Sequence, residues 1–225
     1  MMTPDPLRLV IFDCDGVLVD SEGPANRLVA AEITALGWKL SVEQSLEHFM
    51  GMTLGDMVPV IERHLGRPLP REWPDRLRDR MLDVLAREVE PMPGAVAVLR
   101  GVAALGLPYR VASNSSHAEM AVKFPRCGLA ALVAGRTHSA RDVARGKPAP
   151  DVYLAAAAAE GVPPGACLVV EDSVPGTEAA VAAGMAVLGL APHGDGADLA
   201  ALGARVIRSL DEVVPIARAA MRAAA

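Results

Sequence analysis

The sequence has few cysteines, no surplus of basic residues and no apolar run long enough to cross a membrane. Its three cysteines, Cys14, Cys127 and Cys167, lie far apart in the chain. They form neither a zinc-binding pattern nor a disulfide framework, so we expect reduced thiols. The net charge is −5 and no basic stripe is present, which argues against a nucleic-acid partner. The longest apolar stretch, residues 179–192, falls short of the roughly 20 residues that a membrane span needs.

The beginning of the sequence, MMTPDPLR, lacks the pattern of a signal peptide. Together with the absence of a membrane span, this predicts a cytoplasmic protein. The 225 residues are 52% hydrophobic and 22% charged. This length and composition suit one large domain, or one domain with a smaller insert, and do not indicate disorder.

Short, almost continuous apolar runs alternate with helical patterns over most of the chain. Such runs are typical of parallel strands that are buried on both faces. Strand and helix in alternation predict an α/β protein with a doubly wound sheet. The predicted strands are Leu7–Phe12, Tyr109–Ala112, Cys167–Val170, Ala186–Leu190 and Arg205–Ile207.

Residues 21–90 differ, because they hold four helical patterns and no convincing strand. We therefore predict a helical domain at residues 21–90, inserted into a core formed by residues 1–20 and 91–225. Ser41 is the predicted N-cap of the second of these helices. Residues 51–55 are predicted to form a loop of the insert that faces the active site, with a plain helix–helix turn as the alternative.

Polar side chains follow the predicted strands, at the positions where ligands bind in open α/β sheets. Because the carboxyl ends of parallel strands share one edge of the sheet, we expect these loops to converge. The residues concerned are Asp13 and Asp15 after the first strand, Ser113 and Asn114 after the second, Lys147 in a loop before a helix, and Glu171 and Asp172 after the third strand.

This set of residues suits phosphoryl transfer. Clustered carboxylates repel one another, and a hard dication such as Mg²⁺ relieves the repulsion through oxygen ligands. Asp13 leaves its strand first and is the candidate nucleophile. Asp15, two residues later, is placed to protonate the leaving oxygen and then to activate water. Ser113 can bind phosphoryl oxygens, and Lys147 can neutralise their charge.

The motifs FDCDGVLVDSE, ASNSS, GKPAPDVY and VVEDSVPGTEAAVAAGM resemble, in order, the four motifs of the haloacid dehalogenase-like hydrolase superfamily. The resemblance covers nearly the whole chain. It implies a Rossmann-like, mostly parallel sheet with an inserted helical cap. It also implies Asp13 as the nucleophile, Asp15 as the acid/base, and Ser113, Asn114 and Lys147 around the phosphate. Magnesium is then held by Asp13, the Asp15 carbonyl and Asp172, with Glu171 acting through water.

The function expected from the resemblance is a magnesium-dependent phosphatase of a small phosphorylated metabolite, acting as a monomer or weak homodimer. A sugar phosphomutase of the β-phosphoglucomutase type is the first alternative, but this chain has Ala25 and Leu54 where that type carries a histidine and an arginine. A haloalkanoic acid dehalogenase is disfavoured by Asp15, and a phosphonate hydrolase by the lack of a suitable lysine, since only Lys39 precedes residue 100. A phospho-acceptor signalling module without turnover has a comparable acidic pocket, but it is about half as long.

Overall fold

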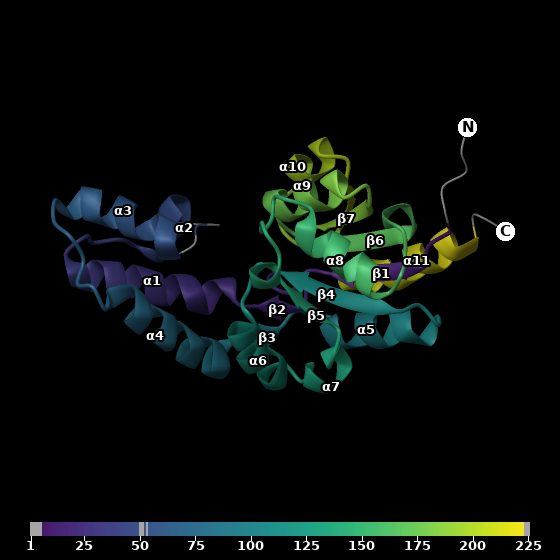
Figure 1. Ribbon diagram of the computed structural model, residues 1–225, viewed down its shortest axis with the longest axis horizontal. Coiled ribbons are helices and arrows are strands. Elements are labelled where there is room, and N and C mark those ends of the chain that lie inside the picture. The colour runs from purple at the N-terminus through teal and green to yellow at the C-terminus, as the bar shows by residue number, and fades with distance from the viewer. Residues whose placement is uncertain (1–5, 50–51, 53, 223–225) are drawn as a thin grey trace. The chain divides into compact units, whose positions relative to one another are not determined.

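The computed structural model describes residues 6–49, 52 and 54–222, and within them the chain forms two compact units. The first, called the core unit below, consists of the described residues among 1–20 and 90–225, namely 6–20 and 90–222. The second, called the helical unit, is Ser21–Val89. Figure 1 shows the sheet in the former and a group of helices in the latter.

A six-stranded parallel sheet organises the core unit. Its strand order is β5-β4-β1-β6-β7-β8, so that the first strand of the chain lies in the middle of the sheet. Each residue of β1 is paired in register with β6, from Leu9 opposite Cys167 to Phe12 opposite Val170. The strands are β1 (Leu9–Phe12), β4 (Tyr109–Ser113), β5 (Thr137–Ser139), β6 (Cys167–Glu171), β7 (Ala186–Leu190) and β8 (Arg205–Ile207).

The order of the strands determines where the helices lie. From β1 the chain moves outward through β4 to β5, and then it crosses back to β6 and continues to β7 and β8. Because crossover connections are right-handed, reversing direction moves the connecting helices to the opposite face of the sheet. The helices are α5 (Ala95–Ala104), α6 (His117–Arg126), α7 (Ala130–Val133), α8 (Asp151–Ala159), α9 (Val174–Ala182), α10 (Ala197–Ala201) and α11 (Val213–Arg222), with 3₁₀ turns at Ala140–Asp142, Pro164–Ala166 and Leu210–Glu212.

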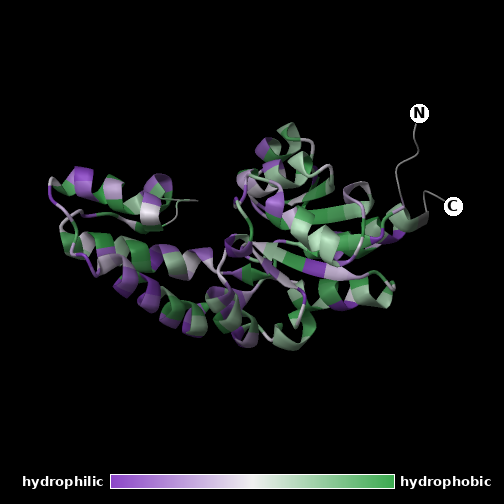
Figure 2. Ribbon diagram, viewed as in Figure 1, coloured by the Kyte–Doolittle hydropathy of each residue, from purple (hydrophilic) through white to green (hydrophobic). Residues whose placement is uncertain are grey.

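The sheet strands are apolar on both sides because helices cover both faces. All four residues of β1 are buried, and Leu9 and Ile11 share one core cluster with residues of α8 and α9. On the alternate side, Phe12 packs edge-on against Tyr109, with ring centroids 6.4 Å apart. Figure 2 shows the sheet strands as mainly hydrophobic, whereas hydrophilic and hydrophobic residues alternate along α1 and α4 of the helical unit.

The described part of the helical unit contains four helices: α1 (Glu22–Leu36), α2 (Val42–Phe49), α3 (Leu54–Leu65) and α4 (Trp73–Glu88). Their buried residues, among them Ile33, Ile61 and Leu77, form a second core that is separate from that of the sheet. The predicted N-cap is confirmed, since the backbone N–H of Gln44 donates to Ser41 Oγ at 3.2 Å. Of the predicted loop at 51–55, Gly51 and Thr53 lie outside the described residues, and the prediction is wrong for Leu54 and Gly55, which begin α3.

The predicted α/β fold is confirmed, and each of the five predicted strands is present. Three strands were missed because they are very short: β5, β2 (Val19–Asp20) and β3 (Glu90–Pro91). β2 and β3 pair antiparallel, with Asp20 opposite Glu90. The chain leaves the core unit for the helical unit after β2 and re-enters it at β3, so this pairing connects the two segments of the core unit. Within the described residues, no helix has the length and apolarity needed to span a bilayer.

Candidate active site

The candidate site lies at the carboxyl ends of β1, β4 and β6, where connections on opposite faces of the sheet diverge. Asp13 directly follows β1, and its backbone N–H donates to the carbonyl of Val170 at 2.9 Å. This bond extends the β1–β6 pairing by one residue and ties the Asp13 backbone to the sheet. Ser113 and Glu171 are the last residues of β4 and β6. The sheet thus positions the residues of three separate motifs at one edge, as the sequence predicts.

Lys147 joins two of the predicted carboxylates. Its Nζ donates to Asp13 Oδ1 at 2.5 Å and to Glu171 Oε1 at 2.7 Å. The Lys147 side chain is only 4% exposed, and its Nζ lies 4.7 Å from the centre of the Tyr153 ring. The Lys147 backbone N–H donates to Asn114 Oδ1 at 3.0 Å, so the exposed Asn114 helps to hold the lysine loop.

The Glu171 carboxylate is held by donors on both of its oxygens. Lys147 Nζ and the Tyr153 hydroxyl donate to Oε1, the latter at 3.0 Å. The backbone N–H groups of Asp172 and Ser173, each at 2.8 Å, and the Ser173 hydroxyl donate to Oε2. Glu171 therefore fixes both Lys147 and the start of the loop that carries Asp172.

Two glycines make room for the carboxylates. A Cβ on Gly16 would overlap the carboxylate of Asp172, and Gly16 also has a φ of +78°, which side-chain-bearing residues rarely adopt. A Cβ on Gly176, in the first turn of α9, would overlap the carboxylate of Glu171. The close approach of the acidic loops to the backbone thus depends on the absence of a side chain at both positions.

The charges of the site are not balanced by lysine alone. Burial raises the pKa of Asp13 from its ordinary 3.8 to about 7, and the negative charges of Glu171 and Asp15 add to this effect against the opposing effect of Lys147. Burial also acts to raise the pKa of Glu171, but Lys147 and the Ser173 hydrogen bonds outweigh it, so that this pKa is lowered. One ammonium is shared by two carboxylates, and Glu171, with more donors, retains its charge more readily.

This excess of negative charge fits a divalent cation. Asp13, Glu171 and Asp172 each offer an oxygen, and these oxygens lie within 4.8 Å of one another. Hard oxygen donors with a net negative charge are the ligands that Mg²⁺ prefers. Asp13 and Asp172 fit the predicted ligand set, and Glu171 is occupied on both oxygens by the donors described above.

The Asp15 carboxylate lies in a second set of contacts, apart from the three-carboxylate cluster. Ser115 Oγ donates to Asp15 Oδ2 at 2.7 Å, and Ser113 Oγ donates to the same oxygen at 3.3 Å. Lys123 Nζ donates to Asp15 Oδ1 at 2.6 Å. Ser113 and Asp15, predicted from separate motifs, are therefore brought together.

Sequence reasoning missed Lys123, Ser115 and Tyr153. Lys123 had a recognisable signal, because it stands between Met120 and Phe124 on what becomes the buried side of α6. A lysine at such a helical position must find a partner for its charge. Tyr153 had no comparable signal, since an aromatic residue in a helix is ordinarily part of the core.

Cys14 lies between Asp13 and Asp15 but takes no part in these contacts. It is completely buried, and burial raises the pKa of its thiol well above the ordinary value, with the Asp15 charge adding to the effect. A thiol in such surroundings is unreactive. Cys14 therefore packs at the end of β1 as a small apolar residue.

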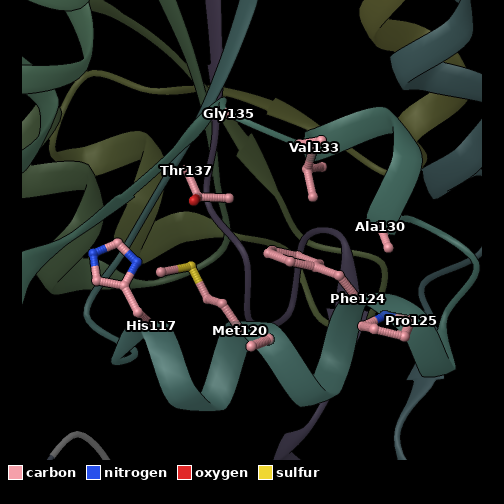
Figure 3. A pocket seen from close by; sticks show the side chains of 10 residues that line it. His117, Met120, Phe124, Pro125, Ala130, Val133, Gly135 and Thr137 are labelled. Carbon is pink, nitrogen blue, oxygen red and sulfur yellow. The ribbon is translucent and has the colours of Figure 1, made fainter.

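An apolar pocket of about 340 Å³ opens between α6, α7 and β5. Figure 3 shows His117, Met120 and Phe124 pointing into it from α6, toward Val133 and Thr137. Its lining includes none of the predicted site residues. It is therefore distinct from the acidic cluster.

The fold and the acidic edge together define an α/β protein with carboxylate and lysine side chains at the carboxyl ends of parallel strands. The family model described as haloacid dehalogenase-like hydrolase matches residues 7–184, and the chain belongs to this family. The predicted resemblance is thereby confirmed, and so is the assignment to hydrolytic enzymes.

Relatives with named activities support the same class. The chain is 29% identical over 182 residues to 6-phosphogluconate phosphatase of Escherichia coli, covering 80% of this chain and 81% of the relative. It is 31% identical over 193 residues to hexitol phosphatase A of the same organism, covering 79% and 80%. A crystal structure of a haloacid dehalogenase family hydrolase from Deinococcus radiodurans, with bound phosphate and sodium, is 32% identical, with a TM-score of 0.80 and coverage of 96% and 97%.

Proposed function

We propose that this protein is a magnesium-dependent phosphatase of a small phosphorylated metabolite, which acts through an aspartyl-phosphate on Asp13. The observation that carries the proposal is the Lys147 ammonium between Asp13 and Glu171, at 2.5 and 2.7 Å, beside a cluster of oxygens suited to a dication. Names of relatives point to the same reaction, since two of them are phosphatases of sugar-acid or polyol phosphates.

In the first step of the proposed reaction, a carboxylate oxygen of Asp13 attacks the phosphorus atom of the ester. The bond from phosphorus to the leaving oxygen breaks, and Asp15 gives that oxygen a proton. In the second step Asp15 takes a proton from water, the water oxygen attacks phosphorus, and the bond to Asp13 breaks. Inorganic phosphate leaves, the Asp13 carboxylate is restored, and Asp15 is protonated again.

The remaining residues hold and neutralise the reacting groups. Lys147 holds Asp13 in place and offsets negative charge on the phosphoryl group, and Ser113, with Asn114 at the same strand end, is assigned to the phosphoryl oxygens. Asp13, the carbonyl of Asp15 and Asp172 are assigned as magnesium ligands. When bound, magnesium neutralises the charge that builds up on the transferring phosphoryl oxygens.

The helical unit is assigned the role of a cap that selects the leaving group. It has a core of its own and is joined to the core unit through β2 and β3, which pair at the point of departure and return. Sugar phosphates are the first substrates proposed, followed by sugar-acid phosphates and phosphoglycolate-like compounds. Of the two named relatives, one is a phosphatase of a sugar-acid phosphate and the other of a polyol phosphate.

The test measures phosphate release from p-nitrophenyl phosphate and from a panel of sugar, sugar-acid and polyol phosphates in the presence of Mg²⁺. We expect turnover by the wild type and by Asp79→Asn, a matched change at an exposed position in α4, and none by Asp13→Asn. Excess EDTA is expected to stop the reaction. Borohydride reduction of the working enzyme, followed by peptide mass spectrometry, is expected to find homoserine at position 13.

Distinct results would overturn distinct parts of the proposal. Activity retained by Asp13→Asn would remove this residue as the nucleophile, and activity in EDTA would remove the metal. Stable phosphorylation without turnover would indicate a phospho-acceptor module. Conversion of a sugar 1-phosphate to its isomer, faster than phosphate release, would indicate a phosphomutase.

A further inference from the structure

Lys123 is a buried cation to which the proposed reaction assigns no role. It lies on α6 between Met120 and Phe124, and only 2% of its surface is exposed. A buried ammonium is costly unless charged partners and hydrogen bonds compensate for lost hydration. A lysine kept at this position therefore requires a partner inside the protein, and the contacts of its Nζ identify it.

Both contacts of Lys123 Nζ lead to the proposed acid/base. Nζ donates to Asp15 Oδ1 at 2.6 Å and to Ser115 Oγ at 2.7 Å. Ser115 Oγ in turn donates to Asp15 Oδ2 at 2.7 Å. Lys123 and Ser115 thus hold opposite oxygens of one carboxylate and also hold each other. This closed triangle defines the direction of the Asp15 side chain.

The frame behind the triangle is rigid. α6 begins with a capping box in which the Ser116 backbone N–H donates to Glu119 Oε2 at 2.6 Å, and Ser116 Oγ accepts from the Glu119 backbone at 3.3 Å. The Ser139 hydroxyl donates to the Ser115 carbonyl at 2.7 Å. The loop that carries Ser115 and the helix that carries Lys123 are therefore anchored to each other and to β5.

Lys123 and Asp15 are buried to different extents. The side chain of Lys123 is 3% exposed, whereas that of Asp15 is 29% exposed. The cation is thus the more deeply buried partner, and part of the Asp15 side chain is exposed to solvent. The lining of the apolar pocket does not include Lys123, whose Nζ lies within hydrogen-bond distance of Asp15.

We propose that Lys123, together with Ser115, is a positioning residue that holds the Asp15 carboxyl in the orientation needed to protonate the leaving oxygen. The proposal rests on the phosphatase mechanism above, in which Asp15 is the proton donor. The same ammonium stabilises the carboxylate that remains after the proton has passed to the leaving oxygen. A mere contribution to folding is the competing explanation, and the two differ in their dependence on the leaving group.

The test compares kcat/KM of Lys123→Met for p-nitrophenyl phosphate and for the alkyl phosphate that proves best in the substrate panel. An alkoxide needs a proton to leave, whereas p-nitrophenolate does not. We expect a loss of about 10- to 100-fold on the alkyl phosphate, mainly in kcat, and of less than about threefold on the aryl phosphate. Arg126→Met is the matched control, because Arg126 lies on the same helix in an exposed ion pair with Glu90.

A double-mutant cycle with Asp15→Asn shows whether the effect passes through Asp15. The single variant Asp15→Asn is expected to lose roughly 10²- to 10⁴-fold on the alkyl phosphate. If Lys123 acts through Asp15, then Lys123→Met costs less than about twofold in the Asp15→Asn background. An equal loss on both substrates, or an undiminished loss in that background, would overturn the positioning role.

The outcomes also separate this inference from the proposed function. If Asp15→Asn itself shows no dependence on the leaving group, then Asp15 is not the proton donor and the mechanism fails together with the inference. If Asp15→Asn shows the dependence and Lys123→Met does not, only the inference fails. Should Lys123→Met fail to fold, Ser115→Ala removes the bond to Oδ2 without stranding a charge. Ser115→Ala is expected to show the same selective loss of kcat/KM on the alkyl phosphate. If this selective loss does not occur, the result counts against the inference.

Discussion

In metal-free protein, Asp13→Asn is expected to increase the free energy of unfolding near neutral pH, even though it abolishes the proposed activity. Asp13 is 6% exposed, and burial raises its pKa from 3.8 to about 7. Above that pH the folded protein must hold a poorly hydrated anion beside Glu171 and Asp15. Asparagine has nearly the same shape and keeps an oxygen that can accept a bond from Lys147, but it carries no charge.

The sign and the size follow from the two pKa values. Because the pKa of Asp13 is higher in the folded state, the folded protein binds more protons than the unfolded chain between about pH 4 and 7. The contribution of this group to stability therefore falls as the pH rises through that window, and the full penalty remains above it. At about 1.36 kcal/mol per pH unit, the penalty is at most about 4 kcal/mol. The gain from Asp13→Asn is smaller, because Lys147 loses one of its two carboxylate partners.

Urea unfolding in EDTA, followed by circular dichroism, measures the effect. The difference between Asp13→Asn and wild type is expected to be close to zero near about pH 4 and to grow by one to three kcal/mol, roughly, by about pH 8. Asp79→Asn, which changes an exposed carboxylate, is expected to follow the wild type. Added Mg²⁺ is expected to stabilise the wild type and not Asp13→Asn. A difference that stays constant with pH would refute the view that Asp13 is a strained anion in the metal-free site.

Two further predictions concern packing. A glycine-to-alanine change inside a helix normally stabilises it by about 0.5–1 kcal/mol. Gly176→Ala is nevertheless expected to lower both the melting temperature and phosphatase kcat, because the Cβ of the new alanine would overlap the Glu171 carboxylate. Gly23→Ala in α1 serves as the control, and an unchanged kcat in Gly176→Ala would contradict the assignment of Glu171 as the residue that fixes Lys147. Leu77 is buried in the core of the helical unit, and Leu77→Ala is expected to lower the free energy of unfolding by about 2–5 kcal/mol in urea. Leu154→Ala, at a position 38% exposed, is expected to lower it far less. Equal losses of unfolding free energy would contradict the assigned core of the helical unit.

Much of the fold was predictable because its elements have local signatures. Strands buried on both faces are continuous apolar runs, and this pattern located five of the strands in the sheet. β5 escaped prediction because its three residues, Thr137–Ser139, include two polar side chains and a histidine. β2 and β3 have two residues each, and their pairing depends on contact between parts of the chain that lie far apart in sequence.

The candidate site was predictable to the extent that its residues follow strands. Asp13, Ser113 and Glu171 lie at strand ends, and parallel strands bring those ends to one edge. The local sequence pattern identified which side chains lie at this edge of the sheet, but not which lysine forms an ion pair with which carboxylate. Lys147 reaches Asp13 across 134 residues of sequence, and Lys123 reaches Asp15 across 108.

The sequence by itself therefore determined the class of fold, the family and which acidic residues follow the strands of the sheet. These features depend on short patterns and on the order of the motifs. The tertiary structure alone decided how the charges are divided. It assigned Lys147 to Asp13 and Glu171, and Lys123 to Asp15. The physical reason is that a buried ammonium must lie within hydrogen-bond distance of its partner, and only the packing of α6 and of the Lys147 loop against the sheet determines which carboxylate that is.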